Sequence, residues 1–108
     1  MHELIGAGRF TATGSAQYVE HLRVPDLSCG TYSLPAGAHD PQDPHTEDEL
    51  YVCTAGRATL WTPGGTATMT PGSVVFVPAG EEHRFVEVTE DFAVVVVFGP
   101  AEESRATV

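Results

Sequence analysis

Apolar and polar residues alternate along most of the chain in short runs, and proline or glycine interrupts each run. A period of two is typical of β-strands with one buried face. The pattern predicts eight strands: Gln17–Val24, Leu27–Leu34, Glu49–Thr54, Arg57–Thr62, Thr66–Thr70, Ser73–Val77, His83–Val88 and Phe92–Phe98. No stretch of about ten residues gives a convincing helix. Short strands that recur about every 8–12 residues predict an all-β jelly roll or small barrel.

A chain of 108 residues has room for one domain. We expect residues 16–100 to form the barrel, with an N-terminal arm at 1–15 and a C-terminal tail at 101–108. The strand at Gln17–Val24 follows the arm and would leave an open sheet edge, which proteins tend to cover. We therefore expect a homodimer, the commonest closed assembly.

The charge balance narrows the possible partners. Fifteen acidic residues against five basic ones give a net charge of −10, and all five basic residues are arginine. Without lysine, Schiff-base chemistry and the P-loop lysine are excluded. An acidic chain also lacks the basic surface that binds nucleic acid or anionic membranes, so we expect neither partner.

The location is inferred from what the sequence lacks. No apolar run approaches the roughly 20 residues that span a bilayer, and the N-terminus has no basic segment before an apolar core. We expect a cytoplasmic protein in which Cys29 and Cys53 are free thiols.

Three side chains suggest a metal site. His45 and Glu49 close a polar, proline-containing stretch, and His83 begins a later strand after the turn Pro78-Ala79-Gly80. If these segments are neighbours in one barrel, the three side chains converge. Two histidines and a carboxylate with open coordination positions suit Fe(II), and Mn, Ni, Co or Zn also fit. The alternative is that histidines at strand ends and acids in loops are solvated surface groups.

These residues resemble the two motifs of the cupin family. The motif positions are Gly37, Asp43-Pro44-His45, Glu49 and Gly56, followed by Gly72, Pro78-Ala79-Gly80, His83 and Glu87. The family usually has histidine where Asp43 stands and asparagine where Glu87 stands. The resemblance covers Gly37 to Glu87 by motif and implies a double-stranded β-helix, or jelly-roll, barrel with little or no helix.

The resemblance also implies a divalent metal ion, whether Fe, Mn, Zn, Ni or Co. The ligand set would be Asp43, His45, Glu49 and His83. If Asp43 points away from the cavity, or only caps nearby backbone amides, the other three ligands remain and leave three positions open.

Strand alternation adds two candidate catalytic residues. If Glu49 faces the cavity, so does Tyr51, which would donate a proton to a bound molecule. If His83 faces the cavity, so does Glu87, as a general base or as a partner that fixes an imidazole tautomer. The alternatives are a packed tyrosine with a satisfied hydroxyl and a solvated acid at the end of a strand.

Two classes of function fit these residues, both with a small-molecule partner. One is a small metalloenzyme that acts on a small organic molecule in a dioxygenase-, isomerase- or cyclase-like reaction. The other is a cupin that binds or senses a small ligand without catalysis. Loss of the first histidine and of the asparagine favours altered chemistry or none. Serine hydrolysis is excluded, because no serine has a Gly-x-Ser-x-Gly context.

Overall fold

The computed structural model describes residues 1–6 and 16–104, so parts of the predicted arm and tail lie outside the described residues. The described residues form six strands: β1 (Gln17–Val24), β2 (Leu27–Leu34), β3 (Asp48–Thr62), β4 (Gly65–Met69), β5 (Val74–Val77) and β6 (Arg84–Gly99). They contain no helix, and hence none that could cross a membrane. The predicted all-β fold is confirmed.

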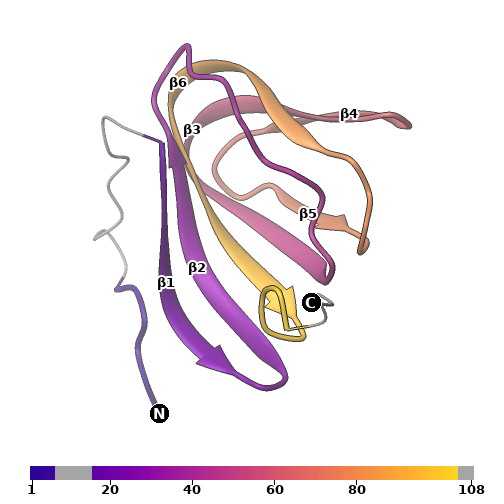
Figure 1. Ribbon diagram of the computed structural model, residues 1–108. Coiled ribbons are helices and arrows are strands. Elements are labelled where there is room, and N and C mark those ends of the chain that lie inside the picture. The colour runs from indigo at the N-terminus through magenta and orange to yellow at the C-terminus, as the bar shows by residue number, and fades with distance from the viewer. Residues whose placement is uncertain (7–15, 105–108) are drawn as a thin grey trace.

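Antiparallel pairing joins all six strands. The order is β1-β2-β6-β3-β4, and β5 pairs with β3. β3 and β6 pair along nearly their full lengths, from Asp48 opposite Gly99 to Trp61 opposite Arg84. Figure 1 shows these two long strands curving over the top of the molecule, with β1 and β2 beside one half and β4 beside the other. The result is the double-stranded β-helix that the sequence motifs predict.

Each long strand joins two segments that the sequence pattern predicts as separate strands. β3 continues through Gly56 and β6 continues through residues 89–91, so the predicted strand ends at these places are wrong. The pairing register shifts there instead, between Cys53 and Thr59 of β3. Gly56 has a φ of 77°, and a Cβ on it would lie 2.1 Å from the carbonyl oxygen of Asp91. Glycine thus lets the two strands cross closely where both bend.

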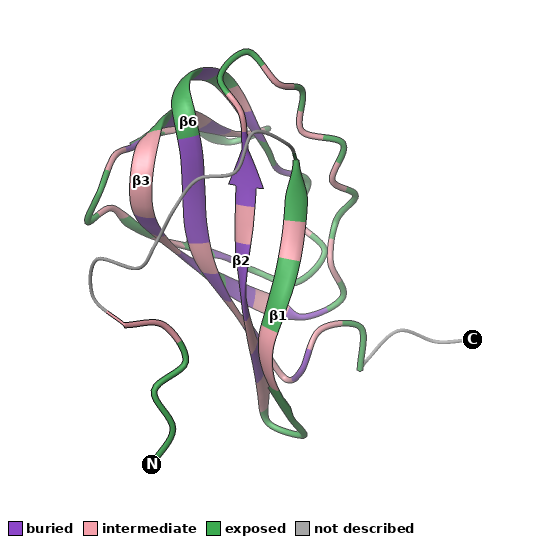
Figure 2. Ribbon diagram, turned by 90° about the vertical axis from the view of Figure 1, so that its left-hand side faces the viewer, coloured by how far each residue is buried: buried purple, intermediate pink, exposed green. Residues whose placement is uncertain are grey.

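The core lies between the two halves of the curved sheet. Its largest apolar members are completely or almost completely buried: Leu34, Tyr51, Leu60, Met69, Phe85 and Phe92. Figure 2 shows buried and intermediate segments following one another along β2 and the C-terminal half of β6, whereas β1 is intermediate or exposed throughout. The same interior also holds buried ionisable groups, Glu49 and His83 among them. A sheet whose inner face carries such groups provides a site as well as a core.

Candidate metal centre

Backbone contacts between two turns bring His45 and His83 together. His45 lies in the loop that precedes β3, and His83 lies just before β6. The amide of Gly80 donates to the carbonyl of His45 over 2.8 Å, and the amide of Ala79 donates to Oδ1 of Asp48 over 2.8 Å. The Pro78-Ala79-Gly80 turn is therefore held against the loop. This explains how residues 38 positions apart in sequence share one site.

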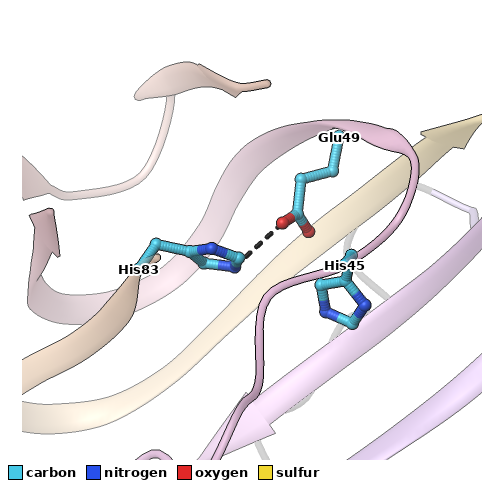
Figure 3. Close-up of side chains that lie close together, drawn as sticks. All are labelled: His45, Glu49 and His83. Atoms are coloured by element: carbon cyan, nitrogen blue, oxygen red, sulfur yellow. Dashed lines mark ion pairs between the residues drawn. The ribbon is translucent and has the colours of Figure 1, made fainter. Parts of the chain in front are cut away.

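His45, Glu49 and His83 form one cluster. One potential ligand atom from each residue lies within 4.8 Å of the others. Glu49 and His83 are 2 % and 1 % exposed, and His45 is half-buried. Figure 3 shows the side chains of Glu49 and His83 pointing toward each other, with the imidazole of His45 beside them. The structure thus brings together three of the four ligands that the sequence suggests.

The hydrogen-bonding capacity of the cluster is unbalanced. Nδ1 of His83 lies 2.8 Å from the carbonyl oxygen of Glu81, which can only accept, so this nitrogen carries a proton. Nε2 then presents a lone pair when the ring is neutral, yet it lies 2.8 Å from Oε1 of Glu49. Apart from its contacts with His83 and Tyr51, the buried carboxylate of Glu49 has no hydrogen-bond donor among the described residues. The site therefore requires a positive charge between Glu49 and His83.

Without a metal, a proton on His83 supplies that charge. Burial lowers the pKa of His83, but the hydrogen bonds to Glu49 and to the Glu81 carbonyl, together with the charge of Glu49, outweigh burial and raise it above its usual value. A divalent cation meets the same need and also takes up the second carboxylate oxygen. Two donors bound to one ion at about 2.1 Å lie about 3.0 Å apart at right angles and about 4.2 Å apart when opposite. The three ligand atoms, which all lie within 4.8 Å of one another, are spaced closely enough that the three side chains could hold one ion.

Tyr51, on the inner face of β3, lies next to the cluster. Its side chain is fully buried, and its hydroxyl lies 3.0 Å from Nε2 of His83 and 3.2 Å from Oε1 of Gln42. Burial first, and then the charge of Glu49, raise the pKa of Tyr51. The phenol therefore keeps its proton at neutral pH and acts as a hydrogen-bond donor inside the site.

The other two residues suggested by the sequence lie away from the cluster. Asp43 is exposed and does not join the group of three. Glu87 is also exposed; its Oε2 accepts a hydrogen bond of 3.4 Å from Thr59, and it borders an open hollow of about 730 Å³ that contains none of the three clustered residues.

Strand alternation fails at Glu87 for a local reason. Val86 pairs with Thr59, but Glu90 pairs with Arg57, so β6 carries extra residues between these two pairs. Glu87 adopts a φ of 50° in this bulge. The bulge shifts the inward-facing set by one position: Phe85 is buried and so is Val88, whereas Glu87 faces solvent.

The structure adds three polar residues that sequence analysis did not single out. Asp40 accepts hydrogen bonds from the hydroxyl of Tyr32 and the backbone amide of Phe85, each over 2.7 Å. Gln42 reaches Tyr51, and Oε2 of Glu102 lies 3.6 Å from Nδ1 of His45. None occupies a motif position, and only the folded loop and the turn after β6 place them here.

A cavity of about 140 Å³ opens beside His45. Apolar and aromatic side chains form most of its wall, with polar groups at one end: Tyr18, Tyr32, Val96 and Phe98, then Gln42, His45 and Glu102. The hydroxyl of Tyr18 is buried and has no hydrogen-bond partner among the described residues. The cavity accommodates a small molecule with an apolar part and at least one hydrogen-bond acceptor.

The family model for the cupin domain matches residues 30–99 of this chain, a range that contains the whole cluster. The chain belongs to the cupin family. An uncharacterised protein of Streptomyces coelicolor is 43 % identical over 91 residues, which cover 84 % of this chain and 87 % of that protein.

Several solved structures share the fold of this cupin. The DMSP lyase DddQ of Ruegeria pomeroyi aligns with a TM-score of 0.69 and 26 % identity over 79 % of this chain, which spans only 42 % of the lyase. KdgF of a Halomonas species aligns with a TM-score of 0.72 and 21 % identity, covering 84 % of this chain and 85 % of KdgF. An RmlC-like cupin of Desulfovibrio desulfuricans aligns with a TM-score of 0.72 and 21 % identity, covering 94 % of this chain and 96 % of that protein. The last two likenesses concern the fold alone.

Proposed function

We propose that this cupin is a small metalloenzyme that binds a divalent first-row transition-metal ion through His45, Glu49 and His83. The observation that carries the proposal is the buried carboxylate of Glu49, which lies 2.8 Å from Nε2 of His83 in a cluster that also contains His45. Two imidazoles and one carboxylate are a donor set for Fe(II), Mn, Co, Ni or Zn. The structurally similar DddQ is a lyase, which supports an enzymatic function for this chain without defining its substrate.

The residues around the cluster suit catalysis on a small molecule. A metal ion held here would supply Lewis-acid or redox chemistry at its open positions. The chain itself provides the surroundings: the cavity walls of Tyr32 and Phe98 exclude water from one side of a bound molecule, and the polar end with His45 orients it. Tyr51 keeps the proton on its hydroxyl, 3.0 Å from Nε2 of His83, and can donate a hydrogen bond to an atom that approaches the cluster. Asp43 and Glu87 have no role in this arrangement.

Metal analysis of the chain purified without a chelating tag tests the proposal. We expect close to one first-row divalent ion per chain, and loss of that ion in His83→Ala, because each ligand is one of very few. Unchanged metal content in His83→Ala would contradict the site. Azide added to the Co²⁺-loaded protein then distinguishes a centre with an open coordination position from a closed one. A changed visible spectrum is expected, and an unchanged spectrum would indicate that no coordination position is open.

A further inference from the structure

The motif position before His45 is filled by Asp43, but a different side chain reaches the cluster. We propose that the side-chain oxygen of Gln42 is the fourth protein ligand of the metal, in the place that the sequence motif assigns to Asp43. Oε1 of Gln42 lies 3.2 Å from Nε2 of His45 and 3.2 Å from the hydroxyl of Tyr51. This inference rests on the proposed metal binding and adds a donor to it.

The orientation of the Gln42 amide is fixed by chemistry. Its Nε2 lies 2.8 Å from Oδ2 of Asp40, and a carboxylate can only accept. The amino group of Gln42 must therefore face Asp40, which leaves its oxygen facing the cluster. Asp40 is itself held by the hydroxyl of Tyr32 and by the amide of Phe85. The oxygen of Gln42 is thus presented to the site by an anchored residue.

The separations between neighbouring polar atoms match those of donors around one ion. Gln42 to His45 is 3.2 Å, and Glu49 to His83 is 2.8 Å. Donors at about 2.1 Å from a metal and at right angles are about 3.0 Å apart. A carbonyl-type oxygen is also a common ligand for hard divalent ions. Because His45 belongs to the cluster with Glu49 and His83, an oxygen beside His45 is placed to add a fourth donor.

The same arrangement accounts for the position of Asp43. Gln42 turns inward to meet Asp40 and Tyr51, and the following residue is exposed. Pro44 comes next and restricts the backbone of Asp43 to extended conformations. The chain therefore points the side chain of Gln42 into the site and that of Asp43, which fills the motif position, out of it. The donor that replaces the family's first histidine therefore comes from the residue one position earlier in the chain.

The test compares Gln42→Leu, which keeps most of the volume, with Asp43→Ala as the matched neighbour. Co²⁺ affinity of the full chain is measured by competition with a chelator, and a crystal structure of the Co²⁺-loaded protein gives the distance from the metal to Oε1 of Gln42. We expect Gln42→Leu to weaken Co²⁺ binding by at least about tenfold. Asp43→Ala should bind within a few-fold of the unmodified chain. The Co–Oε1 distance should be about 2.1 Å.

Each other result overturns the inference in a recognisable way. Weakened binding with Oε1 more than 3 Å from the metal would make Gln42 a residue that only positions His45. Unchanged binding in Gln42→Leu, or a large loss in Asp43→Ala, would remove Gln42 from the ligand set. Failure of the unmodified chain to bind Co²⁺ would overturn the proposed function and this inference together. Thermal unfolding in chelator confirms that both variants are folded.

Discussion

At the end of β3 that carries the cluster, the two faces of the sheet depart from the ordinary distribution of polar and apolar side chains. On the inner face, Glu49 and Tyr51 are buried, with exposures of 2 % and 0 %. On the outer face, Leu50 is 37 % exposed, and Phe76, its partner on β5, is 59 % exposed. A sheet that only packed would place the ionisable groups outside and the large apolar groups inside. The inner face of this cupin therefore carries a buried polar cluster as well as an apolar core.

The largest expected difference between the two faces is the effect of a substitution on the free energy of unfolding. Phe92 is completely buried in the core, whereas Phe76 lies on the outer face. We expect Phe92→Ala to lower the free energy of unfolding by about 3–5 kcal/mol, because it leaves a cavity. Phe76→Ala should change that free energy by less than about 1 kcal/mol. Urea unfolding of both variants in chelator measures the difference.

A large decrease in the free energy of unfolding of Phe76→Ala would contradict this difference between the faces. It would mean that Phe76 is covered in solution, for example by a second copy of the chain. The homodimer that the sequence suggests stays a prediction, and β1 does lie at an edge of the sheet, as that argument assumed. Light scattering on the same samples decides whether a loss of stability accompanies a change of mass.

Neighbouring residues on β3 give the second contrast. Glu49→Gln keeps the shape of the side chain but removes its charge, so we expect metal affinity to fall by more than about 100-fold. Leu50→Gln, one residue along the strand, faces outward and should leave metal affinity unchanged. Isothermal titration with Zn²⁺ in a non-chelating buffer compares the two variants. Equal affinities for Glu49→Gln and Leu50→Gln would show that Glu49 is not a ligand.

The sequence predicts much of this arrangement and misses it where local backbone geometry intervenes. Alternation of apolar and polar residues identifies β1 and β2, and motif spacing identifies the cluster of His45, Glu49 and His83. Both patterns predict correctly here because a proline-containing turn follows each of these strands, and another holds His83 against the loop that carries His45. They fail at Glu87, because the bulge in β6 shifts the inward-facing set and no residue pattern marks a bulge at a non-glycine. They also miss Gln42, since its place depends on Asp40 and not on a strand period.

The pH dependence of stability sharpens the comparison further. The interior contains the ionisable side chain of His83, whereas Leu50 and Phe76 on the outer face have none. The pKa of His83 is raised in the metal-free folded chain, so folding favours the proton on His83. This contribution to stability is fully present below the unfolded pKa of about 6.5 and is lost as pH rises through the higher folded pKa. In chelator, the unfolding temperature of the unmodified chain relative to Glu49→Gln should therefore fall from pH 6 to pH 8.5.

The affinity for metal should depend on pH in the opposite direction, increasing as pH rises. The metal needs the unprotonated Nε2 of His83, so each bound ion displaces the proton that the metal-free site holds. Below the folded pKa of His83, affinity for Zn²⁺ should fall by up to about tenfold for each pH unit. The rise in unfolding temperature caused by added Zn²⁺ should shrink over the same range, by mass action. Melting curves at pH 6, 7 and 8, with Zn²⁺ and with chelator, measure both trends. A rise that stays constant with pH would show that the ion does not compete with the proton on His83, and Leu50→Gln should follow the unmodified chain throughout.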